Sequence, residues 1–322
     1  MNKKVWGFLS LLILSLVVCC SALILAQQTT APPVGGPPAG QGGRGQDQPP
    51  GGRGGRGGAR ARTGRKVVLA WADTRNGVAQ HDSVSHALAV IERLGYESGV
   101  YDTYIRTDSN IISKHPKMTT GEPASGGPNL MMADAIFFLG HREVELTPDQ
   151  KADLLSFVHD DGKGFVAAHI ATTAFLSWPE FGEMIGGRFD SHPWGSVTAN
   201  VINEDPSFPA TRHLPLTFEL HDEFYQTKDF SREKSRVLLR LDTSKLPVNQ
   251  NVHITNGDFP IAWAKMYGKG RVFYASFAHD SKTWDNPDIY QMYFEAIKWA
   301  LKLTDGDATP RPFPAPAAPE VK

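Results

Sequence analysis

The chain has 322 residues, of which 41% are hydrophobic and 21% are charged. That composition supports a buried core and excludes a wholly disordered or fibrous protein. The formal net charge is −1, but residues 1–65 alone carry +7, so the rest of the chain carries −8. An acidic body argues against a nucleic-acid scaffold, and we expect no nucleic-acid partner.

Residues 1–26 have the layout of a secretory signal, with two early lysines, a long apolar stretch and small residues near its end. We therefore expect an exported protein, periplasmic or extracellular. The stretch is also long enough for an uncleaved membrane tether. Both cysteines, Cys19 and Cys20, lie inside it. Cleavage would leave a mature chain without disulfides or a thiolate nucleophile, whereas lipid modification of one cysteine is a second alternative.

Residues 27–65 form a segment rich in Gly, Pro and Arg with almost no large apolar residue. Such a stretch cannot bury enough surface to offset its ordering entropy, so we predict a disordered linker. The Arg-Gly run at residues 51–58 resembles segments that bind RNA in other proteins. Behind an export signal, a solvated tether is the favoured interpretation.

The first predicted strand covers residues 66–71, a short apolar run rich in β-branched residues. A helix should follow, with Asp82 or Ser83 as its cap and Gly95 at its end, because apolar residues recur between them at helical spacing. The sequence then predicts a second strand over residues 96–101.

A long loop is expected over residues 103–130, which have no clear periodicity. The third strand is predicted at residues 133–140 and the fourth at 164–169, with a helix between them that begins at a Thr147–Gln150 capping box. This alternation of strands and helices predicts a parallel sheet in a three-layer α/β sandwich. Ligands of such sheets bind beyond the carboxyl ends of the strands.

After Gly187 the pattern changes to a β-rich portion inserted in the same domain. Strands are expected at residues 196–202, 216–225, 236–241, 261–265 and 271–276. A final helix should run from about residue 285 to about residue 302. We predict one domain over residues 66–304 and a Pro-rich tail over residues 305–322.

The candidate chemistry lies in the histidines, several of which fall at predicted strand ends or beside glycines. These are His81, His141, His169, His192, His221 and His279. His169 is the most informative, because it stands where class I glutamine amidotransferase folds expose their nucleophile. A histidine cannot replace that nucleophile, so the protein is not expected to be a glutamine amidotransferase.

Five motifs in order give a specific resemblance. They are Gly164–Thr172 around His169, Trp178–Phe189 followed by His192, Asp222–Tyr225, Phe259–Trp263, and Tyr267–Tyr274 followed by His279. Together they resemble the ThuA family, named for trehalose utilisation, over about residues 66–303. The resemblance implies a flavodoxin-like, class I glutamine amidotransferase-like fold. It also implies a role in the metabolism of disaccharides or 3-ketosugars, with histidines in the cleft that normally holds the catalytic cysteine.

Two positions depart from the family's usual pattern. The histidine at the strand end is usually followed by serine and the last histidine is usually preceded by glycine, but Ile170 and Ala278 stand at these positions. The first change removes a hydroxyl that could serve as a ligand or a donor.

His169, His192, Glu223 and His279 would make a site of nitrogen and oxygen ligands for zinc or a similar divalent metal. His169, Asp222 and Glu223 are the candidate catalytic residues, with either carboxylate as a base toward a sugar C–H next to a ketone. If the last strand lies beside the strand at 164–168, the side chains of His169 and His279 could converge on one cleft. Ligands of one ion need ring nitrogens within about 3 to 4 Å of one another, and rings more than about 12 Å apart could not share an ion. No nucleotide cofactor is expected.

The candidate substrate-binding residues are His141, Trp178, Trp194, Tyr225 and Trp284. Aromatic rings can stack on sugars, although ordinary core packing is the alternative for each of them. Two functions remain open. One is a sugar-processing hydrolase, lyase or isomerase, and the other is a catalytically inactive module that recognises a carbohydrate or a partner. In the first, and in the carbohydrate-recognising form of the second, the ligand is a small-molecule carbohydrate.

Overall fold

The computed structural model describes residues 64–75, 80–124, 126–140, 146–254 and 256–313. The chain divides into two units, residues 1–57 and 58–322, and every described residue belongs to the second. The predicted signal at 1–26 and nearly all of the linker at 27–65 therefore lie outside the described residues. Within the described ranges, no helix is long and apolar enough to span a membrane.

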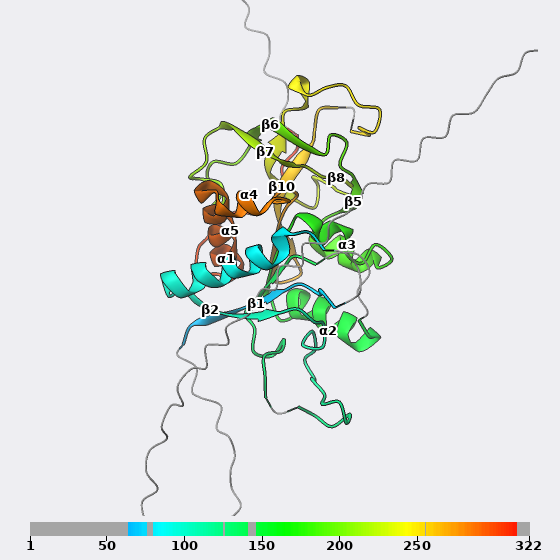
Figure 1. Cartoon of the computed structure of the whole chain (residues 1–322), viewed down its shortest axis with the longest axis vertical. Helices are drawn as coiled ribbons and strands as arrows, with labels where there is room; N and C mark the ends of the chain where they lie inside the picture. The colour runs from blue at the N-terminus through cyan, green and yellow to red at the C-terminus, as the bar shows by residue number, and fades with distance from the viewer. Residues whose placement is uncertain (1–63, 76–79, 125, 141–145, 255, 314–322) are drawn as a thin grey trace, which may run out of the picture. The chain divides into compact units, whose positions relative to one another are not determined.

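Nine strands form one sheet in which a parallel half continues into an antiparallel half (Figure 1). In spatial order they are β2 (Tyr101–Arg106), β1 (Lys66–Trp71), β3 (Ala135–Phe138), β4 (Gly164–Ala168), β11 (Gly270–Ala275), β10 (Pro260–Tyr267), β9 (Arg236–Leu241), β6 (Ser196–Asn203) and β7 (Thr217–Glu223). Strands β2 to β11 in this order pair in parallel, and the remaining pairs are antiparallel. The predicted α/β fold is confirmed, and the β-rich portion largely extends the same sheet.

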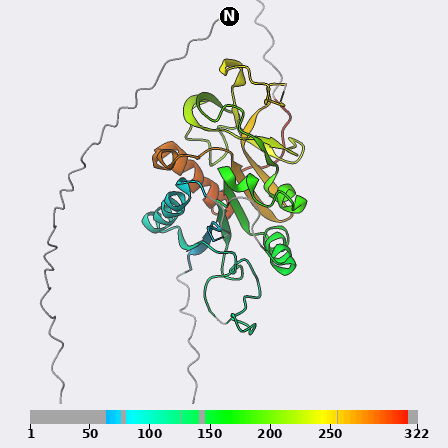
Figure 2. The same cartoon turned by 45° about the vertical axis from the view of Figure 1, so that its right-hand side comes forward.

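Helices cover both faces of the sheet. Figure 2 shows the cyan α1 (Ser83–Ser98) and the orange α5 (Pro287–Ala300) on one side, and the green α2 (Pro148–His159) and α3 (Pro179–Ile185) on the other. The smaller elements are the 3₁₀ helices η1 (His169–Thr173) and η2 (Thr243–Lys245), the short helix α4 (Ser281–Asp285), and the separate pair β5 (Arg188–Ser191) and β8 (Gln226–Lys228).

The central strands read as continuous apolar runs because they are buried on both faces. In β1, Val68 and Ala70 join the core beneath α1 and α5, whereas Leu69 and Trp71 join the core beneath α2 and α3. The alternation of side chains along each strand thus builds two separate cores from one apolar segment.

The predicted end of the first helix at Gly95 and the predicted strand at 96–101 are wrong. Helix α1 continues to Ser98 and ends at Gly99, which has a φ of 66°, and the second strand begins at Tyr101. Gly95 lies inside the helix, where a Cβ would come within 2.4 Å of the Tyr101 ring. Glycine is therefore required at this position by close packing and does not terminate the helix.

The capping box that begins α2 is confirmed. The Thr147 hydroxyl accepts a hydrogen bond from the Gln150 amide at 3.2 Å, and the Gln150 side chain accepts one from the Thr147 amide at 3.1 Å. At the other end of the chain, residues 305–313 of the predicted tail pack against the sheet. Arg236 donates to Asp307 at 2.7 Å, and Ala308 is buried.

Candidate functional site

His169 follows directly after β4, at the carboxyl end of the parallel sheet. Strand β11 lies beside β4, with Ala275 opposite Ala168, so that the segments after both strands begin at the same edge. The last predicted strand therefore does lie beside the strand at 164–168, which was the condition for His169 and His279 to converge. His169 has a φ of 38° and is 1% exposed. A non-glycine residue in this region of backbone conformation is strained, and such strain is typical of functional sites.

A single backbone contact orients the His169 ring. Its Nδ1 lies 2.8 Å from the carbonyl oxygen of Ser276. Because a carbonyl can only accept, Nδ1 carries a proton, and in the neutral ring Nε2 then presents a lone pair. This arrangement is the one that proteins use to hold a metal-binding imidazole in one orientation.

His279 places a second imidazole against the first. Its Nδ1 lies 3.2 Å from Nε2 of His169, and its side chain remains partly exposed. The preceding residue, Ala278, has a φ of 83°, and its carbonyl accepts a hydrogen bond of 3.0 Å from the indole of Trp284. The short loop after β11 therefore turns His279 back toward the end of β4.

Glu223 closes the cluster from the antiparallel half of the sheet. The β6–β7 hairpin pairs with β9 through Val201–Asn203, and Glu223 lies opposite Ser196 at the other end of the hairpin. Its Oε2 is 3.5 Å from Nε2 of His169 and 3.4 Å from Nδ1 of His279.

The electrostatics of the cluster favour a charged carboxylate. Burial by itself would raise the pKa of Glu223, but its bonds with His169 and His279 outweigh burial and hold that pKa well below its usual range. The same bond with Glu223 raises the pKa of His279. Glu223 therefore supplies a fixed negative charge among the imidazoles.

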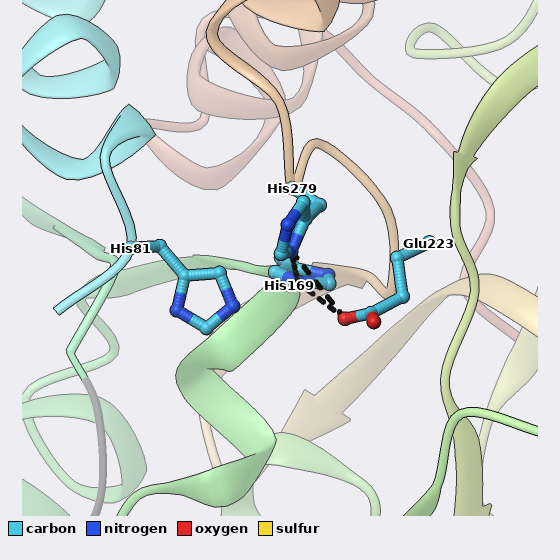
Figure 3. Close-up of side chains that lie close together, drawn as sticks. All are labelled: His81, His169, Glu223 and His279. Atoms are coloured by element: carbon cyan, nitrogen blue, oxygen red, sulfur yellow. Dashed lines mark hydrogen bonds and ion pairs between the residues drawn. The ribbon is translucent and has the colours of Figure 1, made fainter. Parts of the chain in front are cut away.

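His81 is the fourth member of the cluster, and the sequence argument did not select it as a ligand. Its ring centroid lies 5.2 Å from that of His169 and 4.6 Å from that of His279. Figure 3 shows His169 and His279 between the ring of His81 and the carboxylate of Glu223. His81 belongs to the connection from β1 to α1, and the rule that ligands bind beyond the carboxyl ends of strands could have identified it.

One potential ligand atom from each of His81, His169, Glu223 and His279 lies within 4.8 Å of all the others. His192, which was expected among the metal ligands, is not in this group. Its Nδ1 lies 3.4 Å from Oε1 of Glu223, the oxygen that faces away from the other histidines, and its side chain is 50% exposed. His192 thus borders the cluster through Glu223.

Asp222 was a candidate catalytic base, but its carboxylate is 0% exposed. Its Oδ1 accepts from the amides of Glu223 at 2.7 Å and His279 at 2.9 Å, and Oδ2 accepts from the hydroxyl of Thr283. Burial raises the pKa of Asp222. These contacts connect the backbones of Glu223 and His279, and they fit a role in positioning both side chains.

The sequence matches the family model described as ThuA, trehalose utilisation, over residues 67–300. The chain belongs to the ThuA family. A search of the curated proteins found no match.

Two solved ThuA-like structures have the same fold. The protein from Bacteroides uniformis aligns with a TM-score of 0.57 and 20% identity, covering 74% of this chain and 93% of that chain. The protein from Parabacteroides merdae aligns with a TM-score of 0.54 and 16% identity, covering 78% and 95%.

The two departures from the usual ThuA pattern both border the cluster. Ile170 is fully buried in the core beneath α1 and α5. Ala278 adopts the left-handed conformation for which glycine is the usual residue. This chain therefore builds the turn before His279 with a strained alanine.

The aromatic residues predicted to bind substrate in this ThuA protein do not share one site. Tyr225 packs on His169, with ring centroids 4.1 Å apart. Trp178 is buried against Phe181 in the core beneath α2 and α3. Trp284 is fully buried and stacks on Tyr293.

Trp194 is half-buried, and its indole donates to the carbonyl of Pro247 at 2.8 Å. Of the aromatic candidates Trp178, Trp194, Tyr225 and Trp284, the structure brings Tyr225 to the cluster. His141 lies outside the described residues.

A surface pocket of about 580 Å³ reaches the cluster through His81 and His279. Its other lining residues are Gln80, Asp82, Ser83, Asp280, Ser281 and Lys282. This volume is within the range of small-molecule sites. The pocket therefore exposes the two imidazoles that pack against the ring of His169.

Proposed function

We propose that this ThuA protein is exported, binds a divalent first-row metal ion, and acts on a disaccharide or a 3-ketosugar. The observation that supports the metal is the convergence of three imidazoles and one carboxylate within 4.8 Å. Imidazole and carboxylate are the ligands that suit zinc and similar ions. In this proposal His81 takes the ligand position that the sequence assigned to His192.

The protonation of His169 and Glu223 also suits a metal ion. The proton on Nδ1 of His169 is directed at Ser276, which leaves Nε2 for coordination. Glu223 is ionised and brings one negative charge. A bound divalent ion would supply Lewis-acid polarisation of a carbonyl or hydroxyl oxygen of the sugar.

His192 is the residue that we propose for proton transfer. Its Nδ1 contacts Oε1 of Glu223, so a carboxylate orients the ring and Nε2 is directed elsewhere. Half of the side chain is exposed, which lets a substrate approach it. An imidazole is suited to removing a proton from a sugar carbon next to a ketone.

The family description, trehalose utilisation, supports a carbohydrate as the ligand. The layout of residues 1–26 supports export. Tyr225, packed on His169 near His192, provides an aromatic face at the cluster. Aromatic faces of this kind are suited to the apolar side of a sugar ring.

The test is turnover of intact disaccharides and their 3-keto derivatives by the full-length protein, followed by product analysis. We expect the zinc-loaded protein to convert at least one of these sugars and the chelator-treated protein to lose the activity. His192→Asn should lower kcat by about 100-fold or more while the metal content stays unchanged. His221→Asn, on the same strand as Glu223 but directed at Thr198, is the matched control and should leave kcat unchanged. Equal turnover before and after removal of the metal would refute the proposal.

A further inference from the structure

Lys265 is a buried lysine on the face of the sheet opposite to α1 and α5. It lies in β10, its side chain is directed to the same side as that of Trp263, and it is 4% exposed. The Trp263 indole donates to the carbonyl of Ile185 at 2.9 Å, and Nζ of Lys265 donates to the carbonyl of Glu183 at 2.5 Å. Both contacts hold β10 against the end of α3.

The ammonium of Lys265 has no ion-pair partner within 4 Å among the described residues, and the carboxylate of Glu183 attracts it from farther away. Its hydrogen bond there goes to a backbone carbonyl, and none of the ion pairs between described residues includes it. Burial lowers the pKa of Lys265 to about 8. A buried cation without an anion is costly, so a ligand that brings a negative charge would be stabilised there.

A buried hydroxyl that lacks a hydrogen-bond partner among the described residues lies on the strand next to Lys265. Ser235 immediately precedes β9. Strands β9 and β10 are antiparallel and Ala264 lies opposite Arg236, so Ser235 lies opposite Lys265. Ser235 is 1% exposed, and its hydroxyl has no hydrogen-bond partner among the described residues. Buried hydroxyls are nearly always bonded, which indicates that something else accepts from Ser235.

Gly186 keeps space open between these two groups. A Cβ at this position would lie 3.3 Å from both Cδ of Lys265 and Oγ of Ser235. Gly186, Ser235 and Lys265 line a cavity of about 300 Å³. A second cavity of about 650 Å³ also reaches Lys265, and the two cavities share Glu183 and Lys234.

The other charges around the cavity are already paired. Arg188 contacts Asp229 at 2.7 Å, and Lys234 contacts Glu183 at 3.4 Å with both side chains exposed. Lys265 is therefore the cation of the lining that has no direct ion pair among the described residues. The cavity thus offers a buried cation without a direct ion pair and a buried hydroxyl without a hydrogen-bond partner among the described residues. Its volume is at the lower end of the range for small-molecule sites.

We propose that this cavity is a second ligand site, separate from the histidine cluster, that binds a small oxyanion. Lys265 is its counter-ion and Ser235 its hydrogen-bond donor. The carboxylate of a sugar acid and the phosphate of a sugar phosphate share this chemistry. Charge-assisted hydrogen bonds from an ammonium suit either group.

The experiment is calorimetric titration of the full-length protein with sodium gluconate and, separately, with inorganic phosphate at constant ionic strength. We expect one of the two anions to bind with a millimolar Kd. Binding of gluconate would identify a sugar acid as the ligand class, and binding of phosphate would identify a sugar phosphate. Lys265→Met should weaken that binding by about tenfold or more, and Ser235→Ala by about fivefold. Lys245→Met, which changes an exposed lysine in η2, is the matched control and should bind as the parent does.

Folding of the variants is checked by thermal unfolding. Lys265→Met removes a buried charge but also the hydrogen bond to the Glu183 carbonyl, and because these two effects oppose each other its Tm should stay close to that of the parent. The anion should raise the Tm of the parent and of Lys245→Met, but should raise it less in Ser235→Ala. Unchanged affinity in Lys265→Met, or no binding of either anion to the parent up to about 50 mM, would overturn the proposal.

Discussion

Nε2 of His169 and Nδ1 of His279 lie 3.2 Å apart, although 110 residues separate the two histidines in the chain. Their proximity follows from the parallel pairing of β4 with β11, which brings the segments after both strands to one edge. Ser276 follows Ala275, the last residue of β11 in that pairing, and its carbonyl orients the ring of His169. The sheet therefore determines where the cluster forms.

Asp222→Asn should weaken metal binding even though Asp222 is not a proposed ligand. The carboxylate accepts from the amides of Glu223 and His279 and from Thr283, and an amide group cannot accept on both sides. Loss of such supporting contacts typically lowers metal affinity by about 10- to 100-fold. Competition with a chromophoric chelator measures this affinity. Asp242→Asn, at the cap of η2, is the control, and parent-like affinity in Asp222→Asn would exclude the positioning role.

Gly95→Ala should destabilise the protein, although alanine is the better helix former by about 1 kcal/mol. The new Cβ would lie 2.4 Å from the Tyr101 ring, whose hydroxyl donates to the carbonyl of Ile91. Because both are held in place, we expect a loss of about 2 kcal/mol in the free energy of unfolding. Urea denaturation measures it, and a gain in stability would contradict the packing described for α1 and β2.

Asp134 should make part of the stability depend on acid pH. Burial disfavours its charge, but bonds from Lys163 and the Val67 amide outweigh burial and lower the pKa of Asp134 below its ordinary 3.8. A lowered pKa gives stability that is present above the ordinary value and is lost as the pH falls through the folded value.

At pH 7, Asp134→Asn should therefore lower the free energy of unfolding by about 1 kcal/mol. The difference between parent and variant should shrink below about pH 4. Urea unfolding at pH 7 and at pH 3 measures both quantities. A difference that stays constant between the two would show that the charge of Asp134 does not contribute.

Export should depend on residues 1–26. Fusion of alkaline phosphatase, which is active only after export in bacteria, to the full chain should give activity, and deletion of residues 1–26 should abolish it. Protein sequencing from the N-terminus of the exported chain then distinguishes cleavage from an uncleaved tether. Equal activity of both fusions would exclude a signal in this segment.

The sequence allowed the α/β class, the order of the main strands and most of the cluster to be predicted. Two strand ends were predictable because the buried parallel strands β4 and β11 leave continuous apolar runs, and His169 and His279 follow them. Glu223 ends β7, an antiparallel edge strand with alternating burial. The left-handed conformations of His169 and Ala278 were not predictable, because neither residue signals a positive φ.

The remaining differences come from long-range packing. Gly95 was expected to end a helix, but its role is set by Tyr101, which no local pattern reveals. His81 lies just before α1, and its approach to His279 depends on how the β1–α1 connection folds over the sheet edge. The sequence pattern around Trp284 is the same whether its ring binds a sugar or packs in the core. Its contact with Tyr293 is visible only in the structure.

The most direct test of the metal site is elemental mass spectrometry of the purified full-length protein and of single variants. We predict about one zinc or similar ion per chain in the parent and in the His221→Ala control, since the four side chains of the cluster lie close enough to hold a single ion. His81→Ala, His169→Ala and His279→Ala should each contain much less metal while remaining folded by circular dichroism. A metal-free parent after incubation with zinc, or a His169→Ala variant that retains the parent's metal content, would contradict the site.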